Sequence, residues 1–298
     1  MTPVLRKYDN TANFAGKRSK RMKFGGNICR KWATPGEWAA LAKEMGYSAV
    51  YFPLNYLAEQ SEIDAYCAAA KEAGLTIAEV GVWNNTLAPD TQERNAAIEK
   101  AIGQLQLADY VGANCCCNIA GSYSTQWDGP HRDNLTEKAF DEIVATTQRI
   151  IDAAKPQKTF YTLEPMPWMY PDDAQSCLKL INAVDRKGFA AHIDIVNVIC
   201  SPQRYYRNAD VIREWFSLLG DKIKSIHAKD ITLSGKLTVH LSECRPGTGE
   251  LDYRTYIECA NALPEGVSFM LEHMTEEDDY VQATAFIKKT ASEMGIEL

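Results

Sequence analysis

Residues 48–82 read SAVYFPLNYLAEQSEIDAYCAAAKEAGLTIAEVGV and hold one complete strand, helix and strand. The first run, 48–54, is apolar and rich in β-branched and aromatic residues, which indicates a buried strand. Residues 62–73 then repeat apolar side chains at helical spacing and stop at Gly74, a residue that commonly ends helices. A second apolar run, 75–82, follows directly. This order predicts two parallel strands joined by a helix.

The same alternation recurs from residue 22 to the end of the chain. The predicted strands are Met22–Ile28, Ser48–Leu54, Leu75–Val82, Gly112–Ile119, Thr159–Glu164, Gly188–Asp194, Lys222–His227 and Gly266–Glu272. The predicted helices are Pro35–Met45, Glu62–Ala73, Thr91–Tyr110, Leu135–Ala154, Asp173–Arg186, Ala209–Leu219, Tyr253–Ala262 and Asp279–Met294. Eight units of about 35 residues predict an α/β chain that folds as a single (β/α)₈ TIM barrel, because closure buries every strand.

An open, doubly wound sheet is the competing architecture. Such folds commonly carry a glycine-rich phosphate loop after the first strand, and Gly25-Gly26 lies inside the predicted strand without that pattern. A small hairpin is also predicted within 231–241, around Ser234-Gly235. Long loops after barrel strands often carry function.

The charge is divided unevenly along the 298 residues. We predict a basic N-terminal arm, residues 1–21, and place the barrel at 22–298. Residues 1–23 hold seven Lys or Arg and one acid, a charge of +6, and the remaining 25 basic and 38 acidic residues give −13. A net charge of −13 on the residues after 23 argues against nucleic acid as a partner. We expect a solvated arm, with contact to nucleic acid or an acidic neighbouring subunit as the alternative.

The composition favours a cytoplasmic protein with no membrane association. No apolar stretch reaches the roughly 18 residues that a membrane span needs, and the N-terminus lacks the apolar core of a secretory signal. Nine Cys without a CxxC pair indicate reduced thiols rather than disulfides or a structural zinc site. The run Cys115–Cys117 falls inside a predicted strand, where we expect it to pack as small apolar side chains.

Four late strands each end on a residue that can bind a metal. These residues are Glu164, Asp194, His227 and Glu272. In each strand the preceding residue is apolar and faces the helices, so the polar side chain faces the barrel mouth. Three carboxylates buried together would raise one another's pKa, and a divalent cation removes that conflict. Three oxygens and one imidazole suit Mn²⁺, Mg²⁺ or Co²⁺, with Zn²⁺ also possible.

The same positions resemble a known family. Glu164-Pro165, the run 194–197 (DIVN), the run 227–230 (HAKD) and Glu272 resemble the xylose isomerase-like barrel superfamily, in its sugar phosphate isomerase/epimerase branch, and the chain is similar to D-tagatose 3-epimerase and inosose dehydratase. The resemblance implies a metal, usually Mn²⁺, held by the four residues above. It also implies that Glu164 and Glu272 are the catalytic pair, moving protons on opposite faces of the substrate.

Further polar and aromatic residues are candidates for substrate binding. They are His192, Asn197, Lys229, Arg245, Trp127 and Trp168. Asn197 stands where the family often has His, and Arg245 lies farther from His227 than the family's usual Arg. Aromatic side chains, Trp83 included, suit the apolar faces of sugars, while plain packing is the alternative for each. We expect Glu243 and Arg245 to pair if neither binds substrate. We expect His273 to point away from the mouth unless the strand has already ended at this residue.

The sequence therefore predicts a metal-dependent isomerase or epimerase that acts on a small-molecule keto sugar or sugar derivative. Proton abstraction beside a carbonyl would give an enediolate. The same site could serve a lyase or dehydratase that acts on a keto sugar or 3-keto glycoside, and a second subunit covering the mouth would favour that reading. A phosphodiesterase like endonuclease IV and a non-catalytic sugar-binding barrel are alternatives of other classes. We expect a homo-oligomer.

Overall fold

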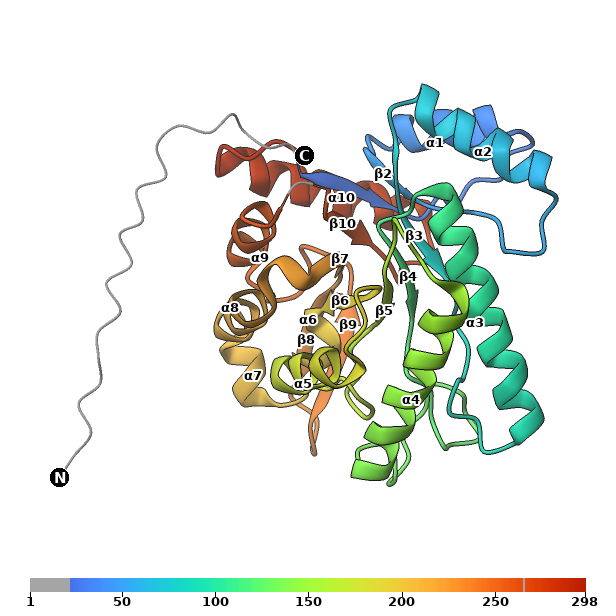
Figure 1. Ribbon diagram of the computed structural model, residues 1–298. Helices are drawn as coiled ribbons and strands as arrows, with labels where there is room; N and C mark the ends of the chain where they lie inside the picture. The colour runs from blue at the N-terminus through green and yellow to red at the C-terminus, as the bar shows by residue number, and fades with distance from the viewer. Residues whose placement is uncertain (1–21, 265) are drawn as a thin grey trace.

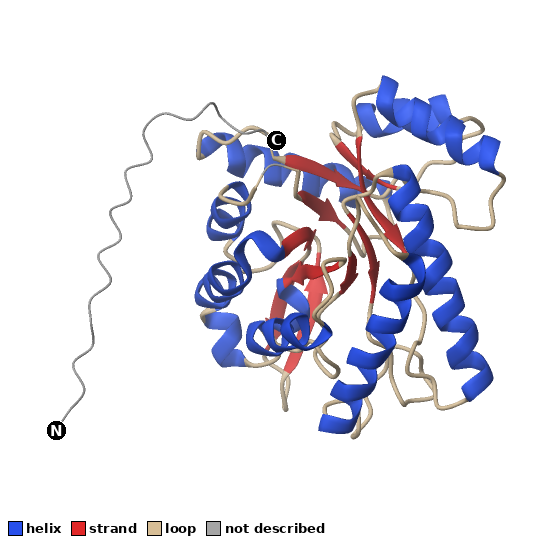
Figure 2. Cartoon of the chain, in the orientation of Figure 1, coloured by secondary structure: helices blue, strands red, loops and turns tan. Residues whose placement is uncertain are grey.

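Eight parallel strands close into one barrel in the computed structural model, which describes residues 22–264 and 266–298 (Figure 1). The order around the barrel is β1, β10, β7, β6, β5, β4, β3, β2, so chain neighbours are also spatial neighbours. Helices surround this ring (Figure 2). The predicted (β/α)₈ barrel is confirmed. The predicted basic arm, residues 1–21, lies outside the described residues.

The strands of the barrel are β1 (Lys23–Gly26), β2 (Ala49–Tyr51), β3 (Thr76–Gly81), β4 (Cys115–Asn118), β5 (Tyr161–Leu163), β6 (Phe189–Asp194), β7 (Ile223–Ala228) and β10 (Ser268–Leu271). The α-helices are α1 (Pro35–Glu44), α2 (Gln60–Glu72), α3 (Thr91–Val111), α4 (Glu137–Ala154), α5 (Ala174–Val184), α6 (Ile195–Val198), α7 (Pro202–Tyr206), α8 (Asn208–Leu219), α9 (Tyr253–Asn261) and α10 (Glu277–Glu293). Each predicted strand and helix is present within a few residues of its expected ends.

Local sequence explains where the first helix begins. Thr34 caps α1 by accepting a hydrogen bond from the backbone N–H of Glu37 at 3.2 Å. The Glu37 carboxylate in turn accepts from the N–H of Ala33 at 2.7 Å, and Pro35 fills the first helical turn, where no N–H is needed. The glycine at position 25 in β1 is required by close packing between two strands. A side chain at Gly25 would collide with the carbonyl oxygen of Ala49, so the approach of β1 to β2 requires glycine.

The hairpin β8 (Asp230–Ser234) and β9 (His240–Cys244) extends from the end of β7. The predicted hairpin is confirmed, although its turn spans residues 235–239 rather than two residues. The Asp230 carboxylate stabilises the start of the hairpin. It accepts hydrogen bonds from the backbone N–H groups of Ile231, Gly247, Gly249 and Leu251 at 2.8–3.0 Å. These bonds fix the 245–251 loop against the barrel mouth.

Strand register places polar side chains at two depths inside the barrel. Asp194 of β6 pairs with His227 of β7, and two residues deeper His192 pairs with Ser225. Alternation along each strand points both pairs inward. The upper pair lies at the carboxyl end of the barrel, the end where TIM barrels carry their active sites.

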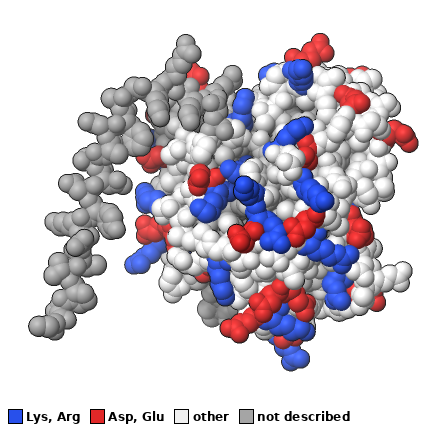
Figure 3. All heavy atoms as spheres, viewed as in Figure 1, with Lys and Arg blue, Asp and Glu red and all other residues white. Residues whose placement is uncertain are grey.

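The outer surface mixes charges of both signs, as the face in Figure 3 shows. Arg186 and Asp152 pair at 2.7 Å, and Arg149 and Glu99 pair at 3.1 Å. Exposed pairs of this kind contribute little stability, on the order of 0–1 kcal/mol each. Among the described residues, no helix is long and apolar enough to cross a membrane.

Candidate metal centre and active site

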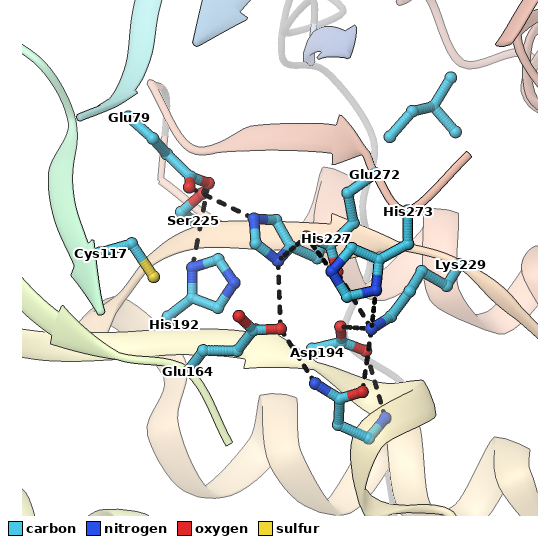
Figure 4. Close-up of polar contacts among 12 residues, drawn as sticks. Glu79, Cys117, Glu164, His192, Asp194, Ser225, His227, Lys229, Glu272 and His273 are labelled. Carbon is cyan, nitrogen blue, oxygen red and sulfur yellow. Dashed lines mark hydrogen bonds and ion pairs between the residues drawn. The ribbon is translucent and has the colours of Figure 1, made fainter. Parts of the chain in front are cut away.

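Four ligand-type side chains meet at the carboxyl end of the barrel. Asp194 ends β6 and His227 lies in β7, while Glu164 and Glu272 directly follow β5 and β10. Their ligand atoms all lie within 4.8 Å of one another, and each residue is buried (Figure 4). The structure therefore brings together all four residues that the sequence singled out for a metal.

The carboxylates of this group face the imidazole of His227 and the ammonium of Lys229. His227 Nδ1 lies 2.9 Å from Glu272 Oε2 and 3.3 Å from Glu164 Oε1. Lys229 Nζ lies 2.7 Å from Asp194 Oδ2 and 3.1 Å from Glu272 Oε1. Positive charge at the centre of the group thus compensates negative charge around it.

The pKa shifts report the same balance. Burial opposes a charge on His227, but the neighbouring carboxylates, chiefly Glu272 and Glu79, outweigh it and raise the pKa of the imidazole well above its usual value. Burial also favours neutral Glu272, yet the charges of His227 and Lys229 hold its pKa well below the usual range. For Asp194, burial prevails over the attraction of Lys229 and raises the pKa well above its usual value. Burial thus disfavours the ionised form of these carboxylates, and neighbouring positive charge favours it.

The donor set fits a divalent cation. Asp194 Oδ2 and Glu272 Oε1 are buried, and among the described residues their one polar contact is the ion pair with Lys229 Nζ, at 2.7 and 3.1 Å. Oxygen and imidazole ligands without sulfur suit hard and borderline divalent metals. Glu164, Asp194, His227 and Glu272 could therefore bind a metal ion.

A fourth carboxylate, that of Glu79 on β3, lies below this group and was missed by the sequence analysis. It is fully buried and accepts hydrogen bonds from Ser225 Oγ and, at 3.2 Å, from His227 Nε2. A carboxylate that accepts the Nε2 proton fixes the ring and leaves Nδ1 facing Glu164 and Glu272. The signal was present in the sequence, because a charged residue inside the apolar run 75–82 requires a buried partner.

Asn197 and Lys229 border the four residues, whereas His192 lies deeper. Asn197 Nδ2 donates to Glu164 Oε1 at 3.0 Å, and its Oδ1 accepts from Lys229 Nζ at 2.9 Å. These bonds position Glu164. His192 has no exposed surface, and burial lowers the pKa of its imidazole to about 4. Its Nδ1 lies 3.9 Å from Glu79 Oε1.

The expected pairing of Glu243 with Arg245 is wrong. Glu243 Oε2 instead lies 3.1 Å from His273 Nδ1 and 3.3 Å from Lys229 Nζ. The Arg245 guanidinium reaches Asp279 on α10 at 3.3 Å. For His273 the stated exception applies: β10 has ended before this residue, and with a positive φ of 57° the ring lies at the mouth, beside Glu243. A cavity of about 150 Å³ lies here, lined in part by Lys229, Arg245 and His273.

The tryptophans lie at different distances from the centre. Trp168 donates its indole N–H to the carbonyl of Asp128 at 2.6 Å. Trp127 lines a separate cavity of about 480 Å³, and none of the four ligand-type residues lines it. Trp83 is 40% exposed, and its ring centroid lies 6.4 Å from that of His227. Of Trp83, Trp127 and Trp168, Trp83 is therefore the one whose ring contacts a residue of the four-residue group.

The family model of the xylose isomerase-like TIM barrel matches residues 39–290. The chain belongs to this family. No curated protein sequence matches it.

Solved structures share the fold at low sequence identity. D-psicose 3-epimerase from Clostridium cellulolyticum H10, solved with D-tagatose, is 15% identical (TM-score 0.66; 93% of this chain and 100% of that chain covered). The probable 3-DHS dehydratase AsbF from Bacillus anthracis is 16% identical (TM-score 0.66; 90% and 97%). A xylose isomerase-like protein from Mycobacterium smegmatis, solved in complex with magnesium, is 17% identical (TM-score 0.64; 92% and 94%). The fold of this chain thus occurs in an epimerase, a probable dehydratase and a protein solved with magnesium.

Proposed function

We propose that this protein is a divalent-metal-dependent isomerase or epimerase that acts on a keto sugar or sugar derivative. One observation carries the proposal: two buried carboxylates, those of Glu164 and Glu272, converge on His227 Nδ1 at 3.3 and 2.9 Å, with Asp194 completing a metal-type donor set. Two carboxylates around one bound substrate can serve as base and acid on its two faces.

The side chains would act in sequence. Glu272 or Glu164 removes the proton from the carbon beside the carbonyl, which gives an enediolate. The other glutamate, which must first take up a proton from solvent, then donates that proton to the opposite face; the product is the epimer, and the first glutamate returns its proton to solvent. Donation to the neighbouring carbon would give the isomer instead. His227 and, 3.1 Å away, Lys229 lower the pKa of Glu272, which favours the ionised carboxylate that can accept a proton.

The cation would be held by Glu164, Asp194, His227 and Glu272. When bound, it would polarise the carbonyl and stabilise the negative charge of the enediolate. We assign Mn²⁺, because three carboxylates and one imidazole suit it, with Mg²⁺ and Co²⁺ as substitutes.

Charge balance favours an uncharged substrate. One divalent cation and the Lys229 ammonium carry three positive charges, against the three carboxylates of the group and the Glu79 carboxylate that contacts His227. Glu243 and His273, 3.1 Å apart at the mouth, compensate each other. Among the described residues that line the mouth cavity, the remaining guanidinium, that of Arg245, is paired with Asp279 at 3.3 Å. We therefore expect free keto sugars or keto glycosides rather than sugar phosphates.

The test is proton exchange with solvent. Ketohexoses, 3-keto glycosides and inososes are incubated in D₂O with the purified protein and Mn²⁺. We expect deuterium at the carbon beside the carbonyl, with loss of this exchange in Glu272→Gln or Glu164→Gln. Glu258→Gln, on the exposed surface of α9, serves as the control. Full exchange in both site variants would refute the assignment, and release of water or an aglycone would identify a lyase.

A further inference from the structure

His192 is a buried imidazole whose hydrogen-bonding capacity is unmet. The residue has no exposed surface, and neither ring nitrogen has a hydrogen-bond partner in the described part of the chain. Buried polar atoms in folded proteins are nearly always paired, so two orphan nitrogens on one ring call for a ligand.

Two further ligand-type side chains lie around the same ring. Cys117 Sγ of β4, a carboxylate oxygen of Glu164 and a ring nitrogen of His192 all lie within 4.8 Å of one another. Figure 4 shows Cys117 and Glu164 on either side of the His192 ring. They come from three adjacent strands of the barrel, and each residue is no more than 3% exposed. The three strands therefore bring a thiol, an imidazole and a carboxylate together inside the barrel.

We propose that Cys117, His192 and Glu164 form a second metal site, selective for Zn²⁺, below the four-residue group described above. Thiolate, imidazole and carboxylate are the ligands of protein zinc sites, and three protein ligands leave the fourth position open. On binding, a sulfur–zinc bond replaces the sulfur–hydrogen bond of Cys117, and the proton passes to solvent. Glu164 belongs to both groups and can offer one carboxylate oxygen to each.

The surroundings of His192 support this assignment. Nδ1 faces Glu79 Oε1 at 3.9 Å, so a proton on Nδ1 points to a carboxylate and leaves the Nε2 lone pair for a cation. Glu79 itself is already bonded to Ser225 and His227, which leaves it the weaker candidate as a ligand. The two sites differ in their ligand atoms. The outer four residues offer only oxygen and nitrogen to a cation, whereas the inner site also offers sulfur.

The sequence offers matched controls in the same strand. Cys115 also faces the barrel interior, two residues deeper, and belongs to no metal-type group among the described residues. Cys116 packs in the hydrophobic core between strands and helices. Substitution of either thiol changes a buried cysteine of β4 without removing a ligand.

Co²⁺ serves as the spectroscopic probe of the full chain. We expect a thiolate-to-cobalt charge-transfer band in the near ultraviolet. The band should disappear in Cys117→Ser and persist in Cys115→Ser and Cys116→Ser. Zn²⁺ stoichiometry should fall by one equivalent per chain in Cys117→Ser alone.

Two results would overturn the site: the absence of this band from the wild-type protein at saturating Co²⁺, or its survival in Cys117→Ser. The measurement on the wild-type protein tests the proposed site even if a variant fails to fold. Asp194→Asn, which removes an outer ligand, should retain the band, so failure of the outer metal site is distinguishable from failure of this one.

Discussion

The Glu79 carboxylate offers the sharpest test of how the centre is organised. Glu79 is buried on β3 and accepts the Nε2 proton of His227 at 3.2 Å, while His227 Nδ1 faces Glu164 and Glu272. A hydrogen bond to a charged acceptor contributes about 1.5–3 kcal/mol. Its loss should weaken cation binding through His227 by about 10–100-fold, the range seen when such outer carboxylates are removed.

We expect Glu79→Gln to lie at the lower end of this range and Glu79→Ala at the upper end, because Gln retains an oxygen acceptor for His227 Nε2. Calorimetric titration with Mn²⁺ measures the affinities, and circular dichroism verifies folding. Glu72→Gln, on the exposed face of α2, is the matched control and should bind like the wild type. A folded Glu79→Ala protein with wild-type Mn²⁺ affinity would refute the role of Glu79.

Three further outcomes follow from the contacts described above. Asp230→Ala removes the acceptor of four backbone N–H bonds and should cost about 3 kcal/mol, which lowers Tm by roughly 6–12 °C in a calorimetric scan; an unchanged Tm would contradict this. Thr34→Ala removes the cap of α1 and should cost about 1 kcal/mol in urea unfolding, whereas Thr34→Ser should be nearly neutral. Mn²⁺ at a hundred times its Kd should stabilise the wild type by about 2.7 kcal/mol and leave Asp194→Asn unaffected, and equal stabilisation of both proteins would exclude Asp194 as a ligand.

The barrel was predictable from the sequence because the apolar pattern of each strand and helix is local and recurs along the chain. A strand of alternating apolar residues and a helix of 3.6-residue period leave repeated marks, and eight repeats leave few ways to bury the strands. The meeting of Glu164, Asp194, His227 and Glu272 was predictable for the same reason, since parallel strands bring their carboxyl ends to one rim.

What the sequence did not reveal depends on contacts between distant segments. Glu79 becomes a partner of His227 only when β3 faces β7 across the barrel. Arg245 and Glu243 are two residues apart, which suggested a pair. The hairpin instead carries Glu243 over Lys229, while Arg245, just past β9, turns to Asp279 on α10. Side-chain direction after a strand ends is not encoded in alternation.

The central claim is that Glu164, Asp194, His227 and Glu272 hold one divalent cation. Electron paramagnetic resonance of Mn²⁺ measures this directly, because free and protein-bound Mn²⁺ differ in signal. We expect one bound Mn²⁺ per chain in the wild-type protein and none in Asp194→Asn or His227→Gln at the same concentrations. A wild-type protein that leaves all Mn²⁺ free, or variants that bind as it does, would contradict the account.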